Sequence, residues 1–547
     1  MRLFMSKQEN GRLPAEGSII TDLSLENAQG GFTRRDMMRT LLAGSLMTVG
    51  GTGLLTASGS AMAQAAQTGK RGGKMRIATQ TSSTADTLDP AKTAHSTDYT
   101  RAHMFYNGLT KLDGKLAPQM VLAEEMLTND AITWTVKLKK GVTFHDGKPL
   151  TPADVVFSLM RHKDPATASK VKVLADQIES VKATGPNEVQ IKLTSANADL
   201  PVILATAQFL IVRDGTTNFS SANGTGAFKL KEFTPGVRTI GVRNENYWKS
   251  GLPYLDEVEL FGIPDEAARV NALLSGDVHW INDVNARSTG RVKGTAGYTV
   301  METKSGQYTD LIMRQDVAPG SSMDFTLGMK YLLDREQIKM AAFRGYAVTA
   351  NDQPIDPTNR FYFAGLPQRA FDPDKAKFHL EKAGVMGSTI PVVASVAATG
   401  SVDMAVLMQQ SAAKIGLKLD VKRVPADGYW SNQWMKVPVG FGNINPRPSA
   451  DILLTQFFKS DAQWNESGWK NAQFDQLVVA ARGETDFTKR KSMYADLQTM
   501  IHEKCGIGIP VFIINLEGMS TKVKGIDPVP LGAFMNYTCA EYVWLDA

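Results

Sequence analysis

The sequence predicts an α/β fold, and the clearest evidence lies between residues 224 and 280. Apolar and polar residues alternate over 227–233 and again over 238–243, with a Pro235-Gly236 turn between them, which is typical of two strands joined by a turn. Residues 265–274 then show the apolar spacing of a helix. Two strands followed by a helix predict a sheet with a helical crossover.

Other segments support this fold class. Alternation predicts strands over 74–78 and 133–139. The run 151–154, Thr-Pro-Ala-Asp, has the N-cap, the first-turn proline and the acid that begin a helix. A Gly-Pro-Asn turn within 179–193 predicts a hairpin. A strand, a helix and a second strand over 391–424 predict a βαβ unit.

Length and composition limit the classes of protein that fit. The chain has 547 residues, of which 43% are hydrophobic and 21% charged, as in a globular protein of two or three domains. The formal charge is +5, but basic and acidic residues are interspersed throughout. That pattern indicates a mixed solvated surface, so no nucleic acid is expected as a partner.

The first 63 residues predict a cleavable export signal. Arg34-Arg35 precedes a glycine-rich apolar segment over 41–57, and Ala61-Met62-Ala63 offers a small-residue cleavage site. The arrangement resembles a twin-arginine signal, which implies the twin-arginine export machinery as a partner and a mature chain that starts near Gln64. The apolar segment is too short and too rich in glycine to favour a membrane anchor.

The chain has two cysteines, Cys505 and Cys539. Neither lies near the cleavage site, so no lipid anchor is expected and the protein should be free in the periplasm. In that oxidising compartment the two cysteines could form a disulfide, and burial as two reduced thiols is an equal alternative.

Three sequence blocks carry a resemblance to a known family. They are GTGAFKL at 224–230, the block N-x-x-YW-x-x-G-x-P-YLDEV at 244–258, and IPDEAARVNALLSGDV at 263–278. Together they resemble the signature of periplasmic solute-binding proteins of the peptide and nickel ABC transporters, the dipeptide- and oligopeptide-binding proteins of cluster C. Residues 323–330 depart from the usual family pattern, which puts local helix packing there in doubt.

The resemblance implies a two-lobed periplasmic binding protein of type II, cluster C, with an extra small domain in the first lobe and a hinge of two chain crossings. The expected segments after the signal at 1–63 are these: first lobe, 64–111, 219–307 and 515–547; small domain, 112–218; second lobe, 308–514.

The resemblance also points to a ligand site. In the family, a G-W-x-x-D-x-x-x-P segment of the second lobe supplies an aspartate that holds the amino terminus of a peptide. The aligned run here is 440–448, and Ile444 occupies the position of the aspartate. Isoleucine cannot neutralise an ammonium group, so the usual amine anchor is missing.

Nearby side chains could bind a ligand in other ways. Arg447 could grip a carboxylate and Asp451 a cation, and the asparagines could donate and accept neutral hydrogen bonds. Aromatic residues could form walls and attract a cation. The expected ligand-binding residues are Phe441, Asn443, Asn445, Arg447, Asp451, Tyr429, Trp430, Trp434, Trp464, His95 and Ser96. No catalytic residue, cofactor or metal is expected.

The resemblance implies a receptor that binds a peptide or peptide-like solute and delivers it to an inner-membrane ABC permease. A monomer is expected. The missing aspartate leaves open an opine or another amino-acid conjugate as the ligand. An exported enzyme is the remoter alternative, and the sequence lacks H-E-x-x-H, C-x-x-C, G-x-S-x-G and G-x-x-x-x-G-K-[ST].

Overall fold

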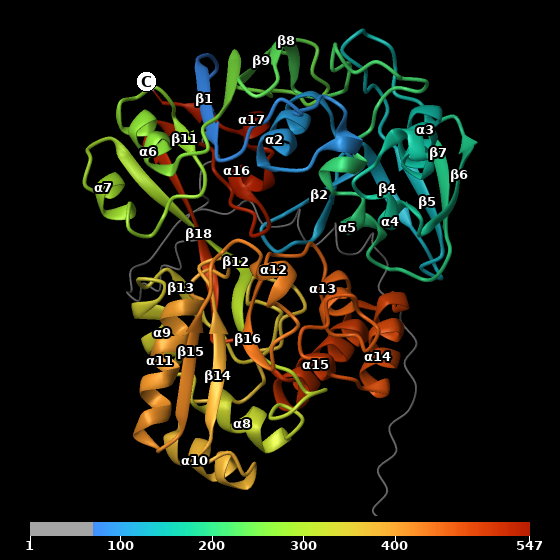
Figure 1. The fold of residues 1–547 in the computed structure, drawn as a ribbon. Helices are drawn as coiled ribbons and strands as arrows, with labels where there is room; N and C mark the ends of the chain where they lie inside the picture. Colours follow the sequence, from blue (N-terminus) through green and yellow to red (C-terminus); the bar gives the residue numbers. More distant parts are fainter. Residues whose placement is uncertain (1–68, 547) are drawn as a thin grey trace, which may run out of the picture. The chain divides into compact units, whose positions relative to one another are not determined.

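A ten-stranded mixed sheet runs through the computed structural model, which describes residues 69–546 (Figure 1). Its main path is β16-β12-β18-β11-β1-β10-β9-β8, while β13 pairs with β18 and β17 pairs with β12. The expected export signal and its cleavage site lie outside the described residues. The helices of residues 69–546 include none with the length and apolar character that a membrane span requires.

Two long antiparallel strands carry the chain between the lobes. β12 (Tyr298–Met313) pairs with β18 (Val511–Ser520), and the register is irregular between Lys304 and Gln307. One end of this pair continues into the strands of the first lobe through β11. The other end continues into the second lobe through β16 and β17.

The first lobe is built around β1, which pairs in parallel with β10 and β11. Its core contains Ile77, Phe105, Leu260 and Trp280, all buried. Its strands are β1 (Lys74–Thr79), β8 (Phe228–Thr234), β9 (Arg238–Arg243), β10 (Glu257–Gly262), β11 (Trp280–Ile281), β19 (Val523–Lys524) and β20 (Trp544–Leu545). Its helices are α2 (Ser96–Phe105), α6 (Glu266–Leu274), α7 (Thr289–Lys293), α16 (Ala533–Asn536) and α17 (Cys539–Tyr542).

A smaller sheet with its own core forms the small domain. The strand order is β4-β5-β7-β6, and the core includes Trp134, Val136, Leu159 and Ile191. The strands are β4 (Ala123–Leu127), β5 (Thr133–Leu138), β6 (Ile178–Gly185) and β7 (Glu188–Leu193), and β2 (Thr110–Leu112) and β3 (Pro118–Met120) form a separate pair. The helices are α3 (Pro152–Met160), α4 (Lys172–Ala175) and α5 (Leu200–Ile203).

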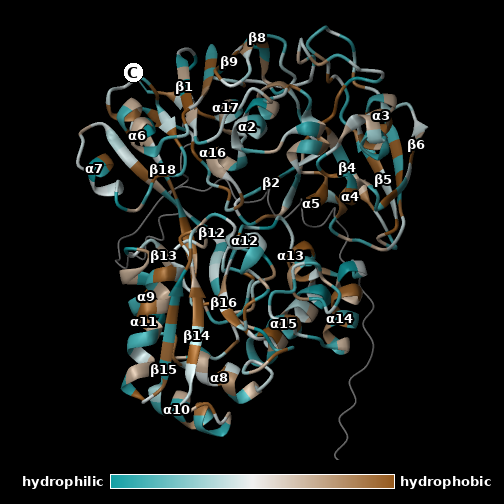
Figure 2. Ribbon diagram, viewed as in Figure 1, coloured by the Kyte–Doolittle hydropathy of each residue, from teal (hydrophilic) through white to brown (hydrophobic). Residues whose placement is uncertain are grey.

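The second lobe contains the parallel pair β14 and β15, beside which α9, α10 and α11 lie in Figure 1. Figure 2 shows β14 mainly in brown, in keeping with its buried Ile390, Val392 and Val393. The strands are β13 (Ala347–Thr349), β14 (Thr389–Ala394), β15 (Lys418–Arg423), β16 (Val439–Ile444) and β17 (Ile507–Gly508). The helices are α8 (Met323–Tyr331), α9 (Arg335–Ala341), α10 (Pro373–Lys382), α11 (Ser401–Lys414), α12 (Tyr429–Asn432), α13 (Ala450–Phe457), α14 (Ala472–Gly483) and α15 (Phe487–Lys504).

The structure confirms the α/β fold class and the elements that predicted it. β8, β9 and α6 lie where alternation and helical spacing place them. Helix α3 begins with the expected capping box, in which the Asp154 carboxylate accepts the backbone N–H of Thr151. The βαβ unit over 391–424 forms as β14, α11 and β15, with parallel strands.

The disulfide alternative is wrong. Cys505 and Cys539 are both free and buried, Cys505 in a core of the second lobe and Cys539 in the core of the first. Burial raises the pKa of the Cys505 thiol to about 11, so it stays protonated at neutral pH.

Candidate ligand-binding site

A pocket of about 160 Å³ lies between the lobes. Pro448, which follows β16 in the second lobe, is one wall, and first-lobe residues form the others. The lining residues are Tyr99, His103, Leu112, Val202, Ala205, Thr206, Ala207, Gln208, Pro448, Leu531, Asn536 and Tyr537. None of these side chains is an aspartate, glutamate, lysine or arginine.

Helix α2 presents two polar side chains to this pocket. Tyr99 and His103 are four residues apart and therefore share one helix face. The Tyr99 ring lies 5.1 Å from that of Tyr537, and the Gln208 amide donates to the Thr93 carbonyl at 2.9 Å and toward the Tyr99 hydroxyl at 3.4 Å. These contacts fix the polar wall from three different segments of the first lobe.

The polar groups of the pocket are neutral at neutral pH. Burial lowers the pKa of His103 to about 4 and raises the pKa of Tyr537 to about 12. The pocket therefore presents hydroxyl, amide and imidazole groups without formal charge. Such a lining suits the uncharged part of a solute.

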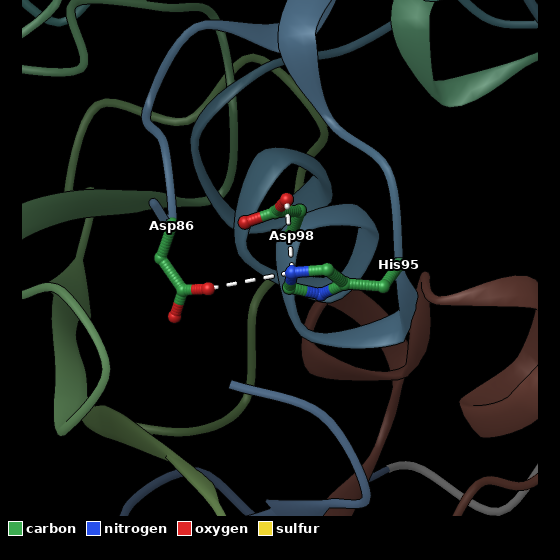
Figure 3. A group of neighbouring side chains, drawn as sticks. All are labelled: Asp86, His95 and Asp98. Carbon is green, nitrogen blue, oxygen red and sulfur yellow. Dashed lines mark ion pairs between the residues drawn. The ribbon is translucent and has the colours of Figure 1, made fainter. Parts of the chain in front are cut away.

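His95 does not line this pocket, although the sequence predicted it to bind ligand. Its Nε2 lies 3.4 Å from Asp86 and 3.5 Å from Asp98, and Figure 3 shows the ring directed toward both carboxylates. One donor atom from each of these three residues falls within 4.8 Å of the others, a spacing that fits a metal ion. However, Arg101 already pairs with Asp86 at 2.9 Å and with Asp98 at 2.5 Å. The group therefore acts as a charge network that fixes the start of α2.

Several predicted second-lobe residues are occupied within their own lobe. Phe441 is fully buried, and its carbonyl accepts the hydroxyl of Tyr429, which is 1% exposed, at 2.7 Å. The Asn443 amide donates to the Thr309 hydroxyl at 2.8 Å. Ile444 packs in the core of the second lobe. These contacts hold β16 in place and leave the side chains of Phe441 and Tyr429 no surface for a ligand.

Asp451 is also occupied. The Arg482 Nε donates to both of its carboxylate oxygens, at 2.9 and 3.0 Å. Asp451 therefore does not offer an unpaired carboxylate to a cation.

Two of the expected tryptophans differ in exposure. Trp464 packs on Phe457 with ring centroids 5.4 Å apart, whereas Trp430 is 41% exposed.

Arg447 differs from these residues because its charge has no acidic partner. Its Nε donates to the Gln456 amide oxygen at 3.0 Å, and its guanidinium lies over the Phe457 ring at 5.2 Å. Its Nη1 donates to the backbone carbonyl of Asn445, an exposed residue, at 2.9 Å. No carboxylate of residues 69–546 forms an ion pair with it. Burial lowers its pKa, but an arginine stays charged. Arg447 directly precedes Pro448 of the pocket wall, so it is the candidate anion binder.

A buried acid pair lies beneath this segment. The Glu466 carboxylate accepts the Trp434 indole N–H at 2.5 Å. Glu466 and Asp310 both approach Gly442 closely. A Cβ at Gly442 would lie 2.2 Å from a Glu466 oxygen and 2.6 Å from an Asp310 oxygen. Burial raises the pKa of Asp310 to about 7, and burial together with the Asp310 charge raises that of Glu466 well above its usual value. Both shifts favour the protonated forms of these carboxyls.

Sequence reasoning missed most of the pocket. Tyr99, His103, Gln208 and Tyr537 were not among the expected residues, and of the two expected first-lobe residues, His95 and Ser96, neither lines the pocket. One signal was available: Tyr99 and His103 are four residues apart, which places them on one side of a helix. Gln208 and Tyr537 carry no such local signal, because the fold brings them to α2 from distant parts of the chain.

Two lobes joined by two strand crossings, with a pocket between them, define a solute-binding protein. Residues 117–466 match the family described as bacterial extracellular solute-binding proteins, family 5 Middle. The chain belongs to this family. It is a periplasmic receptor of the kind that serves ABC importers.

Individual relatives agree with this assignment. The chain is 25% identical to heme-binding protein A of Haemophilus influenzae, over 79% of this chain and 85% of that protein. It is 25% identical to the glutathione-binding protein GsiB of Escherichia coli K12, over 80% of this chain and 88% of that protein. It superposes with a TM-score of 0.68 and 21% identity on the ABC transporter-associated periplasmic binding protein DppA of Helicobacter pylori in complex with the peptide STSA, over 87% and 99% of the two chains. These relatives are binding proteins rather than enzymes.

Proposed function

We propose that this protein binds a short peptide or peptide-like solute that carries a carboxylate, and delivers it to an ABC permease of the inner membrane. Arg447 carries the proposal, because it is a partly buried cation without an acidic partner in 69–546, next to the pocket wall. A ligand carboxylate is a natural counter-charge for a guanidinium. The neutral pocket lined by Tyr99, His103 and Gln208 would take the uncharged part of the same solute.

A second candidate is an amino-acid conjugate, such as an opine, that has no free primary amine. Ile444 favours it, because an isoleucine stands where relatives of the peptide-binding type place an aspartate. Asp451 is already paired with Arg482 and does not replace that anchor. Glu466 is 5% exposed and accepts the indole N–H of Trp434, so it does not replace that anchor either.

Native mass spectrometry of protein from the periplasm, followed by fragmentation of any released solute, tests the proposal. The expected result is a small solute with at least one carboxylate. A free amine in that solute would favour the peptide, and a blocked or secondary amine would favour the conjugate. A released solute without an anionic group would contradict the role of Arg447.

Substitution of Arg447 tests the same contact directly. Arg447→Ala should weaken binding of the identified solute by about 1.5–3 kcal/mol, because it removes a charge-assisted hydrogen bond. The measurement is isothermal titration calorimetry, with Arg423→Ala as the control, since Arg423 is an exposed arginine on β15 of the same lobe. Unchanged affinity of Arg447→Ala would remove this residue from the site.

We also propose that the chain leaves the cytoplasm by twin-arginine export, is cleaved near Gln64, carries no lipid anchor and acts as a monomer. The Arg34-Arg35 pair and the Ala61-Met62-Ala63 site support the first two statements. Intact mass and light scattering of periplasmic protein test them. Arg34→Lys with Arg35→Lys should retain the chain in the cytoplasm.

A further inference from the structure

A second contact between the lobes lies where the small domain meets α14 and α15. Asp199, which directly precedes α5, lies between two arginines of the second lobe. Its Oδ1 accepts Arg490 Nη1 at 2.7 Å and Arg360 Nη2 at 3.4 Å. Beside it, the backbone N–H of Ala198 donates to the carbonyl of Arg482 at 2.8 Å. An ion pair and a backbone hydrogen bond therefore cross from one lobe to the other.

The acidic half of this contact is held by the small domain. The Asn197 side chain accepts the backbone N–H of Asp199 at 2.9 Å and donates to Gln177 at 3.0 Å. Leu200 and Ile203, which follow Asp199 in α5, pack in the core of the small domain. The Asp199 carboxylate is thus positioned by contacts within its own lobe.

The basic half is held by the second lobe in the same way. Arg490 Nε donates to the Ala481 carbonyl at 2.9 Å, and its Nη2 lies 3.4 Å from the Tyr494 hydroxyl. The Arg360 guanidinium lies over the Phe361 ring at 4.8 Å. Both arginines therefore keep their positions without help from Asp199.

We infer that Asp199, Arg490 and Arg360 form an interlobe latch that stabilises the conformation in which the two lobes touch, without contacting the solute. Lobe contact buries the Asp199 side chain to 1% exposure against a guanidinium. Separation of the lobes would hydrate Asp199 and leave Arg490 without an acid. An interaction made in only one of two conformations shifts the equilibrium toward that conformation. The latch would raise the affinity for every solute by a common factor, so the inference rests on the two-lobed fold and not on the ligand class.

Charge around the latch supports attraction between the lobes. Burial alone would raise the pKa of Asp199, but the charges of Arg490 and Arg360 hold it below its usual value. Asp451, which is nearby, is balanced by its own partner Arg482. Asp199 is therefore ionised at neutral pH and attracts the second lobe.

Interlobe distances test the latch. Spin labels at the exposed positions Lys182→Cys and Gln473→Cys report the distance between the small domain and α14. The native Cys505 and Cys539 are buried, so the labels attach selectively to the introduced cysteines. The protein is unfolded and refolded to remove solute and is then measured by double electron–electron resonance. Asp199→Asn and Arg360→Gln should each shift the distribution to longer distances. Glu179→Gln, which breaks an exposed ion pair within the small domain, should not.

Hydrogen exchange gives an independent readout that a purely structural role would not move. The Ala198 amide is protected by a bond that exists only when the lobes touch, so its exchange should accelerate by at least about tenfold in both latch variants, with global unfolding midpoints close to that of the parent. Wild-type distances and wild-type Ala198 exchange in the variants would overturn the inference. Arg360→Gln keeps the test valid if Asp199→Asn fails to fold, since Arg360 is the more exposed partner.

Discussion

Two sites in this protein bury carboxylic acids and shift their pKa values in opposite directions. Asp199 lies against Arg490 and Arg360, and its pKa is below the usual value. Asp310 and Glu466 lie against each other, and the pKa of Asp310 is raised to about 7. Burial disfavours the ionised form at both sites, so the sign of the nearest neighbour decides the outcome.

Because of this difference, Asp199 and Asp310 contribute to folding stability in different pH ranges. The depressed pKa of Asp199 gives stability that is present above pH 4 and is lost as the pH falls through the folded-state value. The raised pKa of Asp310 gives the opposite dependence of stability on pH. The folded state keeps a proton that the unfolded state has lost, so the stability from this site is present below about pH 4 and is lost as the pH rises toward 7.

Replacing Asp310 by an amide should remove the part of this second dependence that comes from Asp310. Wild-type unfolding free energy should fall by about 4 kcal/mol between pH 4 and pH 8 from the Asp310 site, because its pKa rises from 3.8 to about 7 and each pKa unit corresponds to about 1.4 kcal/mol. Asp310→Asn should flatten that fall and be more stable than the wild type at pH 8. The measurement is urea unfolding at a series of pH values.

Two features of the chain sharpen this experiment. Glu517 in the first lobe also has a pKa raised by burial, to about 8, so part of the slope remains and the difference between variant and wild type is the informative quantity. Glu179→Gln, at an exposed ion pair, is the control and should keep the wild-type slope. Parallel curves for Asp310→Asn and the wild type would show that the Asp310 carboxyl does not retain a proton in the folded state at neutral pH.

Steric space also distinguishes the two sites. Gly442 allows the acid pair to form, because a Cβ there would lie 2.2 Å from Glu466 and 2.6 Å from Asp310. Gly442→Ala should therefore destabilise the second lobe by about 1–3 kcal/mol through overpacking. Thermal unfolding measures this, and Gly290→Ala, at an exposed position of α7 where a Cβ meets no atom within 4 Å, is the matched control. Equal effects of the two substitutions would refute the close approach.

The fold could be predicted because its signals are local. Alternation in β5 and β9, the capping box of α3 and the spacing of α6 each follow from a few adjacent residues. The three sequence blocks between 224 and 278 then identified the family. The helix α2 was not predicted, since its residues are mixed in polarity and its apolar face is weak.

The site could be predicted only in part, because its groups meet through the tertiary fold. Arg447 and the change at Ile444 were visible from one aligned segment. The pairing of Asp451 with Arg482, and of Glu466 with Asp310, joins residues from separate elements, and nothing near them in the sequence reports the partner. The sequence therefore predicted Asp451 as a ligand contact, whereas the fold supplies Arg482 as its partner within the second lobe.

Trp434 gives the smallest and most discriminating test of the acid pair. The sequence predicted it as an aromatic wall for the ligand, whereas its indole N–H donates to Glu466 at 2.5 Å. Trp434→Phe keeps the ring character and removes this donor, so it should cost about 0.5–1.5 kcal/mol of unfolding free energy. It should also raise the pKa of Glu466 further, because the indole hydrogen bond lowers it.

The matched control is Trp430→Phe, since Trp430 is 41% exposed and packs edge-on against Trp434 at 5.6 Å. A structural role for Trp434 predicts lower stability with unchanged affinity for the solute, measured by urea unfolding and calorimetry on the same samples. A ligand-wall role predicts the reverse. If Trp434→Phe lowers affinity and leaves stability unchanged, the position of Glu466 does not depend on the indole donor.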